Sequence, residues 1–291
     1  MREFPTVDIL GFPVSRLSME DTVAMLAEEV EARRGRGVDS GLNGNAGLDE
    51  SAGLSGNVGL NESAAPARRL LRVVTANAEI LYAASRHAEQ GALLKNADII
   101  TPDGVGAVKA SITLDRPVAE RVAGVDLLCR LCAEGARRGW SAYLLGAAEE
   151  SAAGTAKRLR QDWPELRLLG WHNGYFDEEE KEKLIQEISG LKPDLLFVAL
   201  GFPAQDRFVE ENRQRLGAGL CVGVGGSFDV LSGRVRRAPR WIQKIGMEWA
   251  YRFAQNPKRL GRFWALPKFS LAVRRQAKRQ RGNQEGRSDK N

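Results

Sequence analysis

Cysteine and histidine are scarce in this chain of 291 residues, which has three cysteines and two histidines. So few cysteines do not build a disulfide framework, and we expect a reducing compartment. Cys129 and Cys132 fall in one expected amphipathic helix. A zinc or redox site would be expected to bring further cysteine or histidine ligands, and no second cysteine pair exists. We therefore interpret both thiols as packing residues.

Several motifs that would define other classes of protein are also absent. No apolar run approaches the roughly 18 residues of a membrane span, and the N-terminus has no basic-then-apolar secretion signal, so we expect a cytoplasmic protein. The chain has no P-loop, and its glycine clusters at 104–106 and 223–226 do not complete the dinucleotide fingerprint. It has no Asp-x-Asp pair of the kind that holds a divalent metal in many nucleotide-sugar transferases.

Charge is distributed unevenly along the chain. From Arg234 onward there are 17 Lys/Arg and 3 acidic residues, a net charge of +14, whereas the preceding residues carry −8 and the whole chain +6. Such asymmetry indicates a polyanionic partner, either nucleic acid, lipid phosphate or a membrane surface. Aromatic and aliphatic residues alternate with the basic ones over 263–281, which favours a helix lying in an anionic lipid interface. For 241–253, membrane contact and packing on the body stay equally open.

The body reads as alternating strands and helices, which predicts a mostly parallel sheet covered on both faces, an α/β Rossmann-like fold. A strand or hairpin at 7–11 and a helix from 19 to 33 come first. Strands are expected at 71–75, 98–101, 141–145, 167–170, 194–200 and 219–224, and helices near 77–95, 104–112, 125–138, 149–161, 178–189 and 205–216.

Polar residues follow several of these strands. Asp103, in Thr-Pro-Asp-Gly, comes after an apolar run, and Thr75 and Asn77 stand where another strand gives way to a helix. Because ligands of open α/β sheets bind at the carboxyl ends of the strands, we expect these side chains to share one site. A carboxylate there suits a general base, although Pro-Asp-Gly is also ordinary turn chemistry.

A set of motifs over residues 7–263 gives the most specific indication. It comprises 73–80, 101–104, 120–126, the Gly-Phe-Pro-Ala-Gln-Asp of 201–206, the Gly-Val-Gly-Gly-Ser-Phe-Asp of 223–229, 236–239 and 248–252. In this order and spacing the set closely resembles the WecG/TagA/CpsF family of bacterial glycosyltransferases. The family's usual Glu after its glutamine is Asp206 here.

The resemblance implies a reaction and a set of residues. Family members transfer a sugar from a UDP-sugar to a lipid-diphosphate-linked N-acetylglucosamine, with inversion and without a metal or other cofactor. Asp103 matches the proposed base, and Thr75, Asn77 and Gln205 match positions that line the pocket. Arg121 suits a phosphate, with an ion pair to Glu120 or Asp126 as the alternative. A family arginine set that closes over the site at the membrane is matched by Arg252, Arg259 and Arg262.

These observations predict a catalytic domain at 1–234, a basic helical membrane-targeting appendage at 235–281 and a disordered tail at 282–291. Residues 41–64 form four hexads beginning Gly-Leu, which we interpret as a duplicated flexible loop inside an insertion at 35–66. We expect a protein at the inner face of the cell membrane. The family pattern is also compatible with a homo-oligomer.

Two other functions stay open at this point. A nucleic-acid-binding protein with a basic C-terminal arm would explain the charge, but it leaves the polar residues at the strand ends without a task. A nicotinamide-dependent oxidoreductase would use the glycine clusters, but it lacks the fingerprint. If the chain is a glycosyltransferase, we expect no nucleic acid among its partners.

Overall fold

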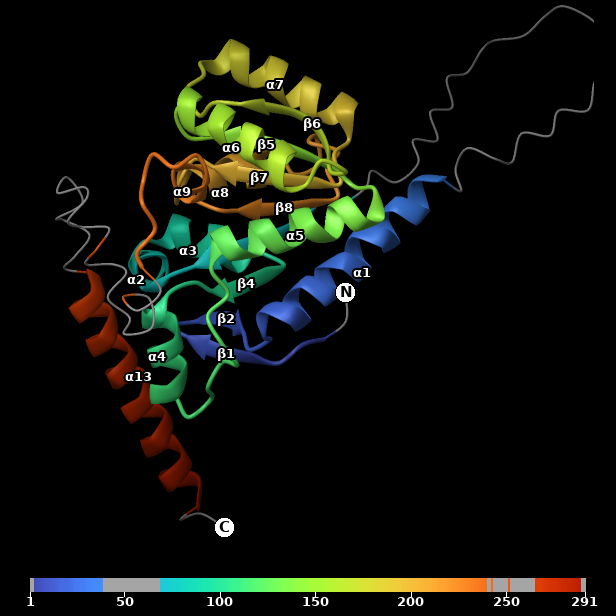
Figure 1. Cartoon of the computed structure of the whole chain (residues 1–291). Coiled ribbons are helices and arrows are strands. Elements are labelled where there is room, and N and C mark those ends of the chain that lie inside the picture. The colour runs from blue at the N-terminus through green and yellow to red at the C-terminus, as the bar shows by residue number, and fades with distance from the viewer. Residues whose placement is uncertain (1–2, 39–68, 240–241, 243–250, 252–264, 289–291) are drawn as a thin grey trace, which may run out of the picture.

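The computed structural model describes residues 3–38, 69–239, 242, 251 and 265–288 (Figure 1). The hexads of 41–64 lie outside the described residues, as does most of the stretch from 240 to 264. The strands are β1 (Thr6–Ile9), β2 (Phe12–Ser15), β3 (Leu71–Ala76), β4 (Ile99–Pro102), β5 (Ser141–Gly146), β6 (Arg167–His172), β7 (Leu195–Ala199) and β8 (Leu220–Gly223).

Helices connect most of these strands. They are α1 (Met19–Val38), α2 (Ala78–Arg86), α3 (Ala88–Lys95), α4 (Val105–Thr113), α5 (Gly124–Arg138), α6 (Glu149–Asp162), α7 (Glu178–Leu191), α8 (Ala204–Glu211), the short α9 (Ser227–Leu231) and α13 (Ala265–Ser288). The sequence predicted most of these elements. It did not predict the break at His87 that divides 77–95 into α2 and α3, nor the end of α8 at Glu211.

The strands form one eight-stranded sheet in the order β1-β2-β4-β3-β8-β7-β5-β6. All neighbouring pairs are parallel except β1 and β2, which form an antiparallel hairpin. The α/β class with a mostly parallel sheet is therefore confirmed. From β3 the chain continues to β4 on one side of the sheet, whereas β8, β7 and β5 lie on the other side. The order in which strands are added therefore reverses between β3 and β8, and folds of this class bind their ligands at such a point.

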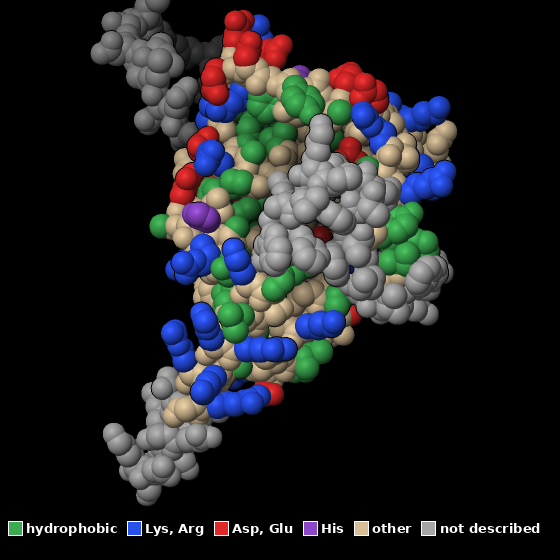
Figure 2. All heavy atoms as spheres, turned by 90° about the vertical axis from the view of Figure 1, so that its left-hand side faces the viewer, with side chains coloured by type: hydrophobic (Ala, Val, Ile, Leu, Met, Phe, Trp, Pro, Cys, Tyr) green, Lys and Arg blue, Asp and Glu red, His purple; other side chains and the backbone are tan. Residues whose placement is uncertain are grey.

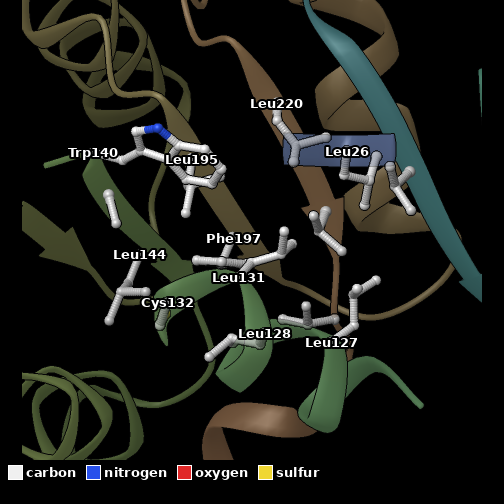
Figure 3. Packing of buried hydrophobic residues seen from close by; sticks show 14 of the residues in the cluster. Leu26, Leu127, Leu128, Leu131, Cys132, Trp140, Leu144, Leu195, Phe197 and Leu220 are labelled. Atoms are coloured by element: carbon white, nitrogen blue, oxygen red, sulfur yellow. The ribbon is translucent and has the colours of Figure 1, made fainter. Parts of the chain in front are cut away.

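Both faces of the sheet are covered by apolar side chains. On one face, α1 and α5 pack against β3, β5, β7 and β8, and Figure 3 shows Trp140, Leu131 and Phe197 meeting in this cluster. On the other face, α2, α4 and α13 belong to one cluster and α7 and α8 to another. Every residue of β3, β5, β7 and β8 is buried, which is expected of parallel strands with helices on both sides.

The cysteines pack as the sequence predicted. Cys132 is fully buried in the core, and Cys129 lies partly buried against the same cluster. Burial raises the pKa of Cys129 to about 11 and that of Cys221 to about 12. Thiols held in the protonated form in this way are poor nucleophiles and poor metal ligands.

Helix α13 lies against α2 and α4 (Figure 1). Phe269, Val273 and Ala277 recur every fourth residue and are buried on that surface. The basic side chains of α13 between Lys268 and Arg281 are exposed, and Figure 2 shows Lys and Arg gathered over this part of the molecule. Of the apolar residues assigned to a lipid interface, Phe269 and Val273 thus pack on the body, and Leu271 is 50% exposed. The helix also extends past residue 281, where a disordered tail was expected to begin.

Helices α2 and α4 approach each other very closely at their first turns. A Cβ atom added at Gly106 of α4 would lie 2.7 Å from the Cβ of Ala78, the first residue of α2. Atoms at that distance overlap, so the contact requires glycine. The two helices that follow β3 and β4 are therefore packed together at their N-terminal ends.

Candidate active site

A pocket of about 300 Å³ opens at the carboxyl ends of β3, β4, β7 and β8. Thr75 is the last but one residue of β3 and Asn77 follows that strand, while Asp103 follows β4, Gly201 follows β7 and Gly225 follows β8. The structure thus brings Thr75, Asn77 and Asp103 to one pocket, as the strand-end argument predicted, and Gln205, which the family resemblance assigned, lines the same pocket. Which of these side chains act in catalysis or binding remains a prediction.

Asp103 lies between β4 and the N-terminal end of α5. Its backbone N–H donates to Ala76 O at 3.0 Å, which ties the end of β4 to β3. Its side-chain Oδ2 accepts a hydrogen bond of 3.4 Å from the N–H of Gly124, the first residue of α5. Backbone N–H groups and the dipole at a helix start favour a negative charge. Asp103 therefore lines the pocket and contacts the start of α5.

Thr75 is 5% exposed, and its hydroxyl donates to Gly223 O of β8 at 2.8 Å. The hydroxyl proton is therefore used to join two neighbouring strands. A Cβ at Gly124 would lie only 3.0 Å from Thr75 Oγ1, so glycine at that position lets α5 approach the strand. Thr75 can still accept a hydrogen bond from a ligand, but much of its contribution is to position the pocket wall.

Asn77 is the N-cap of α2. Its Oδ1 accepts from the backbone N–H of Ile80 at 3.0 Å, the contact that satisfies one free N–H group at a helix start. The amide Nδ2 is the end of the side chain that this contact leaves available to a ligand. A substitution by Asp would keep the cap and replace the donor with an acceptor.

Gln205, at the start of α8, is 2% exposed. Its Oε1 accepts from the N–H groups of Gly201 and Gly225, each at 3.2 Å. One side chain thus joins the loops that follow β7 and β8, and both loops line the pocket. The sequence placed Gln205 in the site as a binding residue, and the structure adds this bracing of the two loops.

The next residue, Asp206, faces a buried ion network instead. Arg72, the second residue of β3, is 2% exposed and donates to Asp206 Oδ1 at 3.0 Å, to Glu210 Oε2 at 2.7 Å and to Leu93 O at 2.7 Å. Burial raises the pKa of Asp206, and the nearby guanidinium of Arg72 opposes this effect. The network holds α8 and α3 against β3, next to the pocket that Gln205 lines.

Arg121 is not among the pocket-lining residues. Its Nη2 lies 3.8 Å from Asp126 Oδ2, so the ion pair considered from the sequence is present, at a long distance. Asp126 binds Arg237 more closely, through two hydrogen bonds of 2.7 and 2.5 Å. This bidentate pair fixes the segment that follows α9 to the first turn of α5. Arg252, Arg259 and Arg262 lie outside the described residues.

The pocket includes residues that the sequence did not single out. They are Glu79, Ile80, Ala83, Gln90, Phe202, Pro203 and Ser227. Glu79, Ile80, Phe202, Pro203 and Ser227 belong to motifs of the family resemblance, so that signal was available. Gln90 stands in α3, in a stretch where no motif pointed to a site. In the described part of the chain, no group of three or more His, Cys, Asp or Glu side chains could hold a metal ion.

An α/β fold with a polar pocket at the strand ends defines the class of protein as a ligand-binding or catalytic α/β domain. Comparison with known proteins then identifies the family. The model of the glycosyl transferase WecG/TagA/CpsF family matches residues 56–283, and the chain belongs to this family. It is therefore a glycosyltransferase, of the type to which the N-acetylmannosaminyltransferases belong.

Curated relatives support this assignment. An N-acetylglucosaminyldiphosphoundecaprenol N-acetyl-beta-D-mannosaminyltransferase of Bacillus spizizenii strain W23 is 37% identical over 201 residues, which cover 69% of this chain and 77% of the relative. Proteins of the same name from Bacillus subtilis strain 168 and Staphylococcus aureus strain MW2 are 32% and 35% identical. These matches cover 71% and 70% of this chain and 80% and 79% of the two relatives.

Proposed function

We propose that this enzyme transfers N-acetylmannosamine, or a closely related sugar, from a UDP-sugar to undecaprenyl-diphosphate-linked N-acetylglucosamine. The product would enter wall teichoic acid or another surface polysaccharide. The relatives' names supply the acceptor and the sugar, and the family resemblance supplies the UDP donor. The observation that carries the mechanism is the carboxylate of Asp103, which lines the pocket and meets the start of α5.

In this mechanism Asp103 removes the proton from the acceptor hydroxyl as that oxygen attacks the anomeric carbon of the donor. The bond between that carbon and the UDP oxygen breaks, so the configuration inverts and UDP leaves. Asn77 orients a sugar through its Nδ2, while Thr75 and Gln205 hold the pocket in shape. The helix start at Gly124 offers a favourable environment for negative charge.

The leaving diphosphate needs cations or oriented N–H groups to stabilise its charge if no metal takes part. Arg121 is one candidate, because a guanidinium can pair with a phosphate through two parallel hydrogen bonds. Arg252, Arg259 and Arg262 match the family arginine set, and we propose that they complete the site when the C-terminal region meets the membrane.

A cytoplasmic enzyme bound peripherally to the inner face of the cell membrane would fit such an acceptor. None of the described helices is sufficiently long and apolar to span a bilayer.

The test replaces Asp103 by Asn and measures transfer by mass spectrometry, with a panel of UDP-sugars and a short-chain lipid-diphosphate acceptor. Loss of a general base lowers turnover by about 10²–10⁴-fold, while binding of UDP measured by calorimetry should persist. Asp162→Asn, a change at an exposed carboxylate at the end of α6, is the matched control and should retain full activity. Near-normal transfer by Asp103→Asn would refute the assignment of the base.

A further inference from the structure

One wall of the pocket differs in chemistry from the strand ends. It is built by α2, which contributes Ile80 and Ala83, and by the connection between β7 and α8, which contributes Phe202 and Pro203. Ile80 and Phe202 are partly buried and pack against the same apolar cluster, so their positions are fixed by the core. This apolar wall therefore offers a surface for a small apolar group of a ligand.

Gln90 of α3 lines the same pocket and carries a polar side chain. Its Oε1 is buried and has no hydrogen-bond partner. Buried acceptors are nearly always paired, because an unpaired one loses its hydration without compensation. An orphaned acceptor in a pocket is thus a position where a ligand's donor group would restore the missing hydrogen bond.

The chemistry of the wall selects among ligand groups. A phosphate has only acceptor oxygens, so it cannot donate a hydrogen bond to Oε1 of Gln90. The carboxamide of Gln90 is also neutral and offers no charge to an anion. A lone hydroxyl could donate to Oε1 but would gain nothing from the apolar side chains. An acetamido group presents an N–H donor beside a methyl group, which matches a pocket lined both by an unpaired acceptor and by Ile80, Ala83 and Phe202.

We propose that Gln90 determines specificity for an N-acetylated amino sugar by accepting a hydrogen bond from the acetamido N–H, while the apolar wall packs against the methyl group. This inference rests on the proposed function, in which donor and acceptor sugars both carry an acetamido group. The shared chemistry does not choose between the two sugars, so the experiment separates them.

The experiment measures kcat/KM for wild type and Gln90→Leu with paired substrates. In the donor arm, UDP-N-acetylmannosamine is compared with UDP-mannose. In the acceptor arm, a lipid-diphosphate-linked N-acetylglucosamine is compared with its glucose counterpart. Leu removes the amide at similar size, and the preference for the acetamido substrate should fall about tenfold, equivalent to about 1.4 kcal/mol, in one arm. The arm that responds identifies the sugar that Gln90 contacts.

Two variants serve as controls. Gln90→Glu keeps an acceptor at the same reach and should retain more of the preference than Gln90→Leu. Gln161→Leu makes the same change at an exposed position of α6 and should leave the preference as in wild type. Because Gln90→Leu removes an unpaired buried acceptor, its Tm should equal or exceed that of wild type. A purely structural glutamine would instead lose stability with its selectivity unchanged.

The outcomes separate this inference from the proposed function. If wild type transfers an N-acetylated sugar and Gln90→Leu keeps its preference in both arms, the role of Gln90 is refuted. If Gln90→Leu fails to fold, Gln90→Met, which is unbranched and lacks the amide, gives the same comparison. Absence of any transfer of an N-acetylated sugar by wild type would overturn the proposed function itself.

Discussion

The central strands and helix α13 are held in the molecule by different means. Strands β3, β5, β7 and β8 are buried on both faces, so each is fixed by two neighbouring strands and two layers of helices. Helix α13 buries Phe269, Val273 and Ala277 in a cluster with α2 and α4, and it contacts β1 through the side chain of Gln276. The comparison indicates that the sheet forms one cooperative unit, whereas α13 can separate from the body by local unfolding.

The largest expected effect is in the sheet, at the buried ion network. Arg72→Leu would leave Asp206 without its cation and weaken the pairing of Glu210, and loss of one partner of a buried pair typically costs about 3–5 kcal/mol. Urea unfolding monitored by circular dichroism measures this change. The control is Arg69→Leu, because Arg69 is also ion-paired but is 77% exposed; it should cost at most about 1 kcal/mol. Equal losses in the two variants would contradict a special role for the buried network.

A second change tests whether α13 separates independently. Phe269→Ala removes the largest buried side chain of α13, and truncation of a buried Phe costs about 3–5 kcal/mol where it is fully packed. We expect hydrogen exchange to accelerate in 265–288 while the amides of β3, β5, β7 and β8 stay protected. Leu271→Ala, at a position that is 50% exposed, should leave exchange unchanged. Loss of protection throughout the sheet would show that helix and sheet unfold together.

A smaller effect is expected where α13 meets the β1–β2 turn. Gln276 accepts from the Leu10 N–H at 2.9 Å and donates to Asp8 O at 2.9 Å and to Asp8 Oδ1 at 2.8 Å. Gln276→Ala should weaken the docking of α13 by about 1 kcal/mol, the net value of a typical hydrogen bond. Hydrogen exchange in α13 reports the change, and Gln280→Ala, at an exposed position, is the control. Identical exchange in the two variants would mean that these bonds do not hold the helix.

The smallest expected effect involves no substitution and leaves the fold intact. It is the slow alkylation of Cys129 in the native protein. Because the pKa of Cys129 is raised from 9.0 to about 11, its thiolate fraction at pH 8 is about a hundredfold below that of an unperturbed thiol. Alkylation by iodoacetamide should therefore be slow at pH 8 and rise about tenfold per pH unit until the pH nears 11. Mass spectrometry of the labelled peptide measures this rate, with urea-unfolded protein as the reference. Fast labelling of the native protein at pH 8 would show that α5 opens readily.

Much of the fold could be predicted because alternating apolar strands and amphipathic helices have clear periods. The break at His87 could not, since no Pro or Gly marks it and His87 simply adopts extended backbone between α2 and α3. The strand ends identified Thr75, Asn77 and Asp103 because parallel topology alone brings such positions together. Arg72 and Gln90 gave no such signal, because their environments come from residues distant in the sequence.

The tight contact of Gly106 with Ala78 limits how the pocket can change shape. Asn77 immediately precedes α2 and Asp103 lies two residues before α4. The positions of these side chains are therefore coupled to two helices whose first turns pack tightly together. We therefore expect any widening of the pocket to come from the loops after β7 and β8, which Gln205 joins through two hydrogen bonds of 3.2 Å. Asp103 then belongs to the rigid side of the pocket and the glycine-containing loops to the side that moves.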